Sequence, residues 1–180
     1  MNLDFQPVQQ ASHLVPESIY QQLHTLDLLD KVQFAEINPD FADGELLHEQ
    51  YNVPFESELN CLVVQGKRNG LVKHAAVLVP YGRKANTGSP AKHALDVSKV
   101  SFAPLEFVIE QTNMEFGSIT PLGLPNDWFI LADASIFEQT DVIIGGGLVK
   151  SKLQIATKDL KQIPNLIVVE NLATSNVKLS

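Results

Sequence analysis

The spacing of apolar residues changes repeatedly along this chain, and that change limits the folds it can adopt. Residues 15–32 place apolar side chains at helical spacing, with Pro16 near the start, and predict an amphipathic helix. Residues 32–38 alternate as a strand does, and residues 41–53 return to helical spacing. The sequence therefore predicts interspersed helices and strands.

The middle of the chain predicts a β-hairpin. Two apolar runs, 59–65 and 71–80, flank a segment whose Asn69–Gly70 pair favours a tight turn. Further along, the pattern predicts helices over 88–95, 104–113, 134–140 and 157–163, and strands over 128–133, 141–146, 151–156 and 166–170. In the first of these helices, Ser89 is the expected N-cap, with Pro90 following it. Because strand and helix do not alternate regularly, we expect an α/β fold of the mixed α+β kind, with a curved, mixed, barrel-like sheet and peripheral helices.

Length and composition predict one domain spanning residues 1–180. A chain of 180 residues that is 44% hydrophobic can bury one sizeable core. Its longest apolar runs, such as 142–149, are far shorter than the roughly 20 residues needed to span a bilayer, so no membrane partner is expected. The first ten residues lack a secretory signal pattern, and a single cysteine, Cys61, fits a reducing compartment. We expect a cytoplasmic protein.

The net charge of −8 is unevenly distributed. Residues 1–60 hold eleven acidic residues and one basic residue, whereas residues 67–99 hold seven basic residues and one acidic residue. The basic segment can contact a phosphate backbone locally, or it can be an ordinary solvated surface. Charge alone favours the second interpretation.

Familiar cofactor and metal motifs are incomplete. Residues 145–151 resemble a phosphate-binding loop, but Val149 stands where such a loop needs glycine before its lysine. Residues 48–52 begin like a zinc-protease motif, but Asn52 replaces the second histidine. We therefore expect no cofactor and no metal. Cys61 alone is more typical of a small buried apolar group than of a nucleophile.

The segment GSITPLGLP, residues 117–125, contains two glycines and two prolines. These residues fix turns around Ile119 and Leu122, so the segment cannot form an ordinary helix or a long strand. It either makes a corner of the fold or forms the wall of a binding site.

Several motifs together indicate a family. Gly117 and Pro121 match a G-x-x-x-P motif, and residues 122–125 match the hydrophobic-Gly-Leu-Pro that follows it. Residues 142–160 match a strand, small-residue turn, strand and short helix, and residues 60–80 match a central hairpin. From Phe41 to Leu160 the chain resembles the YbaK and prolyl-tRNA-synthetase-associated domain family, with the helix 15–31 packed on this region. The resemblance implies a barrel-like mixed sheet with outer helices.

The resemblance also implies a function and a set of site residues. Editing members hydrolyse the ester that joins a wrong amino acid to tRNA, so the expected partner is an aminoacylated tRNA acceptor end, together with an aminoacyl-tRNA synthetase as a further candidate. The implied catalytic residues are Asn60 and Gly117. The implied substrate-binding residues are Cys61, Ser118, Ile119, Thr120, Pro121, Gly145, Gly146, Gly147 and Lys152, and the implied tRNA-binding residues are Lys67, Arg68, Lys73, Arg83 and Lys84.

One position departs from the family pattern. The family's hairpin usually begins with Lys-Thr, where this chain has Asn60-Cys61. An amide can orient a water or a carbonyl but cannot supply positive charge. Two hypotheses follow: an aminoacyl-tRNA deacylase acting in trans with altered chemistry, or a non-catalytic module that binds an aminoacyl or nucleotide end. Lys150 or Lys152 could replace the missing charge, although strand lysines usually face solvent.

Overall fold

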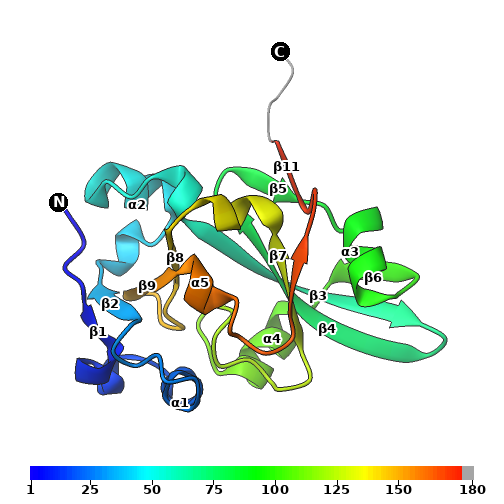
Figure 1. Cartoon of the computed structure of the whole chain (residues 1–180), viewed down its shortest axis with the longest axis horizontal. Coiled ribbons are helices and arrows are strands. Elements are labelled where there is room, and N and C mark those ends of the chain that lie inside the picture. The colour runs from blue at the N-terminus through cyan, green and yellow to red at the C-terminus, as the bar shows by residue number, and fades with distance from the viewer. Residues whose placement is uncertain (176–180) are drawn as a thin grey trace.

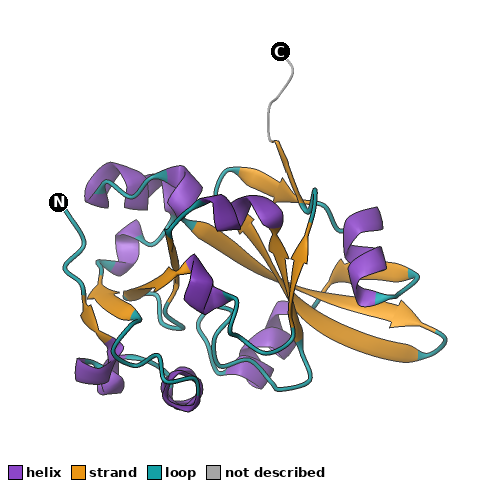
Figure 2. Ribbon diagram, viewed as in Figure 1, coloured by secondary structure: helices purple, strands orange, loops and turns teal. Residues whose placement is uncertain are grey.

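The computed structural model describes residues 1–175, in which two main sheets are surrounded by short helices (Figure 1, Figure 2). The strands form a five-stranded sheet, β10-β7-β4-β3-β6, a four-stranded sheet, β1-β2-β9-β8, and a two-stranded sheet, β11-β5. The strands are β1 Gln6–Pro7, β2 Gln33–Glu36, β3 Leu59–Arg68, β4 Leu71–Pro80, β5 Arg83–Ala85, β6 Lys99–Phe102, β7 Phe129–Asp133, β8 Asp141–Gly145, β9 Ser151–Ala156, β10 Leu166–Val169 and β11 Ala173–Ser175. The helices are α1 Glu17–Thr25, α2 Gly44–Tyr51, α3 Ser89–Leu95, α4 Leu105–Thr112 and α5 Thr157–Leu160.

The hairpin predicted in the middle of the chain is confirmed as β3 and β4, which pair in antiparallel fashion along their whole length. Asn69 and Gly70 form its turn with φ angles of 51° and 78°. A two-residue type I′ turn needs both central residues in this left-handed region, which asparagine and glycine tolerate. β4 also pairs in parallel with β7, and β7 with β10, so the sheet is mixed as expected.

Residues 75–80 of β4 are buried on both faces, so the five-stranded sheet separates two apolar cores. Ala76 and Leu78 contact the larger core, to which strands of the four-stranded sheet also contribute. Val77 contacts the smaller core, which α3 covers. Ile19 and Leu23 of α1 are fully buried in the larger core. The amphipathic pattern at the start of the chain therefore serves to cover this core.

The two main sheets meet at Glu58, which precedes β3 and forms a parallel bridge with Ile143 of β8. Both sheets curve around the larger core, and the helices lie outside them (Figure 2). The predicted mixed α/β architecture with curved sheets and peripheral helices is confirmed. Within residues 1–175, the two main sheets are linked by this isolated bridge, and no continuous ladder closes a barrel.

Two details of the predicted helices are wrong. The helix expected over 15–32 ends at Thr25, because Asp27 has a φ of 58° and leaves the helical region. Ser89 is the first residue of α3 and does not cap it, since Gly88 occupies the N-cap position. The sequence also missed four short strands, β1, β5, β6 and β11, whose few residues carry no clear periodicity. None of the helices in residues 1–175 is long and apolar enough to cross a membrane.

Candidate functional site

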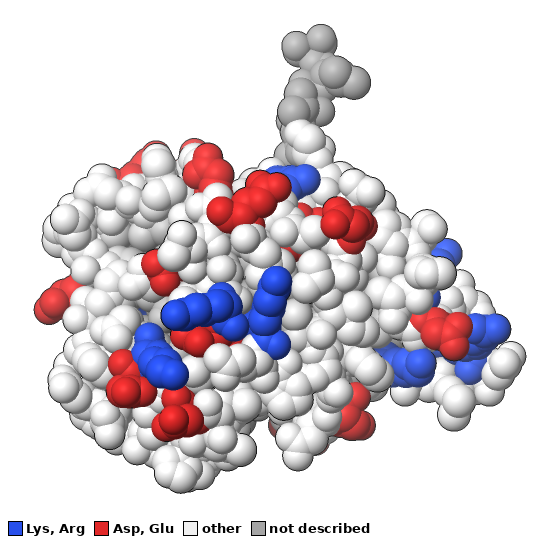
Figure 3. Space-filling view, in the orientation of Figure 1, with Lys and Arg blue, Asp and Glu red and all other residues white. Residues whose placement is uncertain are grey.

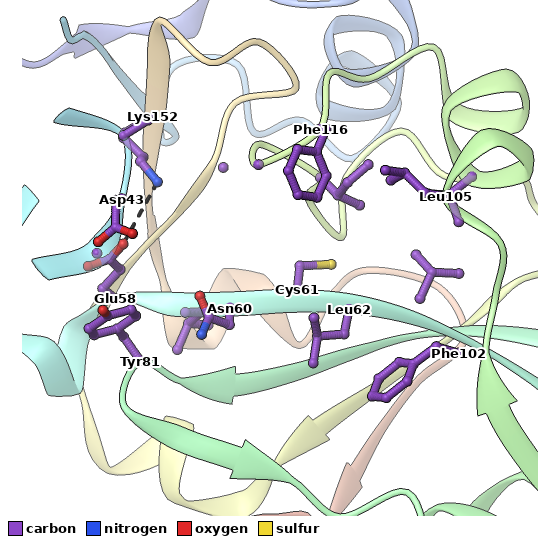
Figure 4. Close-up of a pocket in the computed structure, with 18 of the residues that line it drawn as sticks. Asp43, Glu58, Asn60, Cys61, Leu62, Tyr81, Phe102, Leu105, Phe116 and Lys152 are labelled. Carbon is purple, nitrogen blue, oxygen red and sulfur yellow. Dashed lines mark ion pairs between the residues drawn. The ribbon is translucent and has the colours of Figure 1, made fainter. Parts of the chain in front are cut away.

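A cavity of about 400 Å³ opens beside the first half of β3 (Figure 4). β6 pairs only with Val64–Lys67 of β3, so the preceding residues of β3 have no strand on that edge. Figure 4 shows the charged residues of the wall at one end and exposed apolar side chains at the other. The wall comprises Ala42, Asp43, Gly44, Glu58, Leu59, Asn60, Cys61, Leu62, Val63, Tyr81, Phe102, Ala103, Leu105, Val108, Phe116, Gly117, Ile119, Gly145 and Lys152.

The glycine-proline segment supplies one side of this cavity. Gly117 has a φ of +88°, and a Cβ added there would have only Val149 Cγ1 nearby, at 3.8 Å. The turn closes where the Ser118 N–H and hydroxyl both donate to the carbonyl of Glu115, each at 3.1 Å. Within residues 1–175, the N–H groups of Gly117 and Ile119 donate to no protein acceptor. Both residues line the cavity, so these two N–H groups are candidate donors to an oxygen bound there.

The glycine run that follows β8 is held against this turn. The Gly147 N–H donates to the Ser118 carbonyl at 3.0 Å, and the Glu115 N–H donates to the Gly147 carbonyl at 2.9 Å. A Cβ at Gly145 would lie 2.6 Å from the Ser118 carbonyl oxygen. The glycines therefore allow two backbone segments to approach closely, which fixes the shape of the wall.

Asn60 and Cys61 both lie on the cavity wall, at the start of β3. Both side chains are half-buried. Burial raises the pKa of the Cys61 thiol to about 12. A thiol with a raised pKa stays protonated at neutral pH, and the protonated form is a weak nucleophile.

A buried ion pair lies at the charged end. Lys152 of β9 and Glu58 have side chains that are 8% and 4% exposed, and Nζ and Oε1 lie 3.8 Å apart. Asp43, at the N-cap of α2, lies beside them (Figure 4). From the sequence, Lys152 is a weak candidate because strand lysines usually face solvent, and Glu58 and Asp43 are not predicted. Nothing local marks these carboxylates, because their partner comes from a distant strand.

Burial shifts the pKa of each partner of this pair in the direction that favours its uncharged form. It raises the pKa of the Glu58 carboxyl above its ordinary value, against the opposing effect of the Lys152 ammonium. It lowers the pKa of Lys152, against the opposing effects of Glu58 and Asp43. Perturbed pairs of this kind, lining a cavity, are typical of functional sites.

The structure brings together six of the residues that the sequence suggested for catalysis and substrate binding. Those on the cavity wall are Asn60, Cys61, Gly117, Ile119, Gly145 and Lys152. The other five lie behind the wall or beside it: Ser118, Thr120, Pro121, Gly146 and Gly147. All five are buried, and their contact with substrate stays a prediction.

The predicted tRNA-binding residues fall into groups at opposite ends of β4. Lys67 and Arg68 lie beside the hairpin turn, where Arg68 pairs with Asp96 and positive and negative side chains gather (Figure 3). Arg83 and Lys84 lie on β5, beyond the other end of β4. At about 3.3 Å per residue, the ten residues of β4 span roughly 30 Å. The basic segment does not form one continuous patch.

Some of these basic side chains form hydrogen bonds within the protein. Lys73 Nζ donates to the Leu95 carbonyl at 2.8 Å. Arg83 donates to Ser135 Oγ and to the Ala173 carbonyl, each at 2.9 Å. The side chains of Lys67 and Lys84 are exposed and form no ion pair or hydrogen bond with residues 1–175, so they remain available to a phosphate.

Comparison with known families shows the family to which this protein belongs. A sequence profile described as an aminoacyl-tRNA editing domain matches residues 38–163, which include the whole cavity wall. The chain belongs to the aminoacyl-tRNA editing domain family. The resemblance to YbaK-type proteins is thereby confirmed, whereas the significance of Asn60 stays a prediction. A comparison with curated proteins gives no match.

Solved structures show the fold of this editing domain in other proteins. One, described as a "putative trans-editing enzyme for prolyl tRNA synthetase", has a TM-score of 0.74 at 16% identity and covers 88% of this chain and 96% of its own. Another, described as a hypothetical protein, has a TM-score of 0.74 at 18% identity and covers 87% and 99%. At such identities the similarity establishes a shared fold.

Proposed function

We propose that this editing domain hydrolyses the ester of a mischarged tRNA in trans, with the ester bound in the cavity beside β3. The observation that carries the proposal is the position of Lys152, a buried ammonium on the wall that also holds Asn60 and Gly117. The family's usual lysine is missing at position 60, but β9 supplies a positive charge to the same cavity. This favours an enzyme over a module that only binds.

The geometry supports a reaction without a covalent intermediate. Water attacks the ester carbonyl carbon, the carbonyl oxygen gains negative charge, and the carbon–oxygen bond to the ribose breaks as the ribose oxygen takes up a proton. The free N–H groups of Gly117 and Ile119 and the ammonium of Lys152 are donors for the developing oxyanion. The amide of Asn60 can orient the water or the carbonyl.

The open end of the cavity suits the terminal nucleoside. Phe102 and Phe116 are 61% and 70% exposed at the rim, although large apolar side chains are usually buried. Aromatic rings can stack on a base whatever its identity. With the terminal adenine on these rings, the exposed side chain of Lys84, on β5 beyond the end of β4, can contact the tRNA backbone. We propose that the protein acts on such a substrate in the cytoplasm.

A panel of mischarged tRNAs tests this proposal. Each tRNA is incubated with the protein, and release of its amino acid is followed with time. Release from at least one member above the uncatalysed rate is the expected result. If the protein hydrolyses none of them but still binds them, the proposed hydrolysis is refuted and the non-catalytic module is assigned instead.

A further inference from the structure

Glu58 is almost fully buried, but its carboxylate has few polar contacts that would stabilise a buried charge. Its side chain is 4% exposed, and Oε2 has no hydrogen-bond partner within residues 1–175. Oε1 lies 3.8 Å from Lys152 Nζ, beyond hydrogen-bond distance. Buried carboxylates are nearly always hydrogen-bonded, because desolvating the charge is costly. Because Glu58 is one of the residues that line the cavity, a donor group that enters the cavity can bind its carboxylate after a small shift of the side chain.

The charges at this end of the cavity do not balance. Asp43 and Glu58 carry two negative charges when ionised, whereas Lys152 carries one positive charge. Asp43 is exposed, and its Oδ1 already accepts a hydrogen bond from the Glu45 N–H at 2.9 Å. The buried carboxylate of Glu58 thus has Lys152 as its cation, and its Oε2 has no donor within residues 1–175. One additional ammonium would complete it, since its two oxygens can accept from two donors.

We infer that Glu58 binds the α-ammonium group of the aminoacyl ester, which makes a free amino group a requirement for substrate. This inference rests on the proposed function. An aminoacyl ester has no carboxylate charge but keeps its ammonium, which matches the excess negative charge beside Lys152. The carbonyl oxygen then lies toward the free N–H groups of Gly117 and Ile119.

The other walls specify the rest of the substrate class. Val63 and Val108 are buried apolar residues of the wall, and Ile119 packs beside them. An apolar amino-acid side chain fits such a surface, because burying it needs no hydrogen-bond partner. The substrate class is therefore the ester of an apolar amino acid with an unmodified amino group. Peptidyl and N-acylated esters, whose nitrogen is uncharged, would be rejected.

Non-hydrolysable analogues test this inference apart from catalysis. The probes are 3′-aminoacylamino-3′-deoxyadenosines carrying alanyl, valyl, leucyl or phenylalanyl groups, each paired with its N-acetyl derivative. Affinities are measured by isothermal titration calorimetry. A hydrogen bond to a charged group corresponds to about a 10- to 100-fold change in affinity, so the tightest free-amine probe should bind that much better than its N-acetyl form.

Variants then identify the residue responsible. Glu58→Gln should abolish the preference for the free amine, whereas Glu56→Gln, an exposed glutamate of the same turn, should retain it. If Glu58→Gln does not fold, Glu58→Asp, which keeps the charge but withdraws it from the cavity, should weaken the preference.

Several results would overturn the inference. These are equal affinity for the two forms of the probe, no binding of any probe, or a preference that survives in folded Glu58→Gln. The proposed hydrolysis is judged separately by the panel of mischarged tRNAs, because the amide probes cannot be hydrolysed. A protein that prefers the free amine but releases no amino acid would keep this inference and lose the proposed activity.

Discussion

Replacing Lys152 with methionine separates the contribution of this residue to stability from its contribution to catalysis. At 3.8 Å, the Lys152–Glu58 attraction is about 4 kcal/mol at an effective dielectric of about 20. Without Lys152, Glu58 can avoid a lone buried charge by taking up a proton. At pH 7 this costs at most about 3.4 kcal/mol for a carboxyl of pKa 4.5, and less here because burial has already raised the pKa. We expect Lys152→Met to lower the free energy of unfolding by about 3 kcal/mol.

A second substitution should restore stability but not activity. Glu58→Gln in the Lys152→Met background removes the carboxylate, so most of the lost unfolding free energy should return. The rate of deacylation should stay at least about 10²-fold below wild type, because this variant lacks both the oxyanion donor and the proposed ligand of the substrate ammonium. Urea unfolding and single-turnover deacylation of the tRNA that is hydrolysed fastest measure the two quantities. Lys150→Met is the matched control, because Lys150 is half-buried and lies outside the cavity wall.

The pH dependence of the wild-type rate provides a second readout of Lys152. The ammonium form stabilises the oxyanion, and burial lowers the pKa of Lys152 below 10.5. The enzymatic rate, corrected for uncatalysed ester hydrolysis, should therefore fall as pH rises through a value below 10.5. Wild-type hydrolysis in folded Lys152→Met would refute the assigned role of this residue.

Four other substitutions test the remaining parts of the site. Gly117→Ala should lower the unfolding free energy by about 1–2 kcal/mol in urea titrations, because φ is +88° while the added methyl has space; a larger loss would show that the space is absent. Phe116→Ala should weaken binding of an aminoacyl-adenosine analogue by about 1–3 kcal/mol with little change in stability, since the ring is 70% exposed; unchanged affinity would exclude stacking there. Lys84→Glu should weaken tRNA binding and reduce the slope of log affinity against log salt by about 1, without changing which amino acid is accepted; an unchanged slope would remove Lys84 from the interface. Asn60→Lys should lower the deacylation rate, because a second ammonium would repel Lys152 in the same cavity; unaltered binding and hydrolysis would place Asn60 outside the site.

Local chemistry made much of the fold predictable. Asn69–Gly70 specified the hairpin turn, because few other residue pairs tolerate two left-handed φ angles. The glycines and prolines of 117–125 likewise indicated a shaped turn before its surroundings were known. Helix ends were less predictable, since the end of α1 at Thr25 depends on one residue, Asp27, entering the left-handed region.

The composition of the site was only partly predictable, because it depends on contacts between distant segments. From the sequence alone, Lys152 is expected to be a strand lysine that faces solvent. In the fold, β9 lies beside the junction of the two sheets at Glu58, and Lys152 is buried there. The basic segment 67–99 shows the opposite difference between sequence and fold. Its basic residues follow one another in the sequence, but they do not form one patch in the fold. β4 separates Lys67 and Arg68 from Arg83 and Lys84 by roughly 30 Å.

The structure of the protein bound to a non-hydrolysable aminoacyl-adenosine amide tests the central claim most directly. The account predicts that the ligand occupies the cavity beside β3, with its carbonyl oxygen within hydrogen-bond distance of the Gly117 N–H or Lys152 Nζ. The adenine should stack on Phe102 or Phe116. A ligand bound elsewhere, or one in the cavity with its carbonyl oxygen contacting neither donor, would contradict the account.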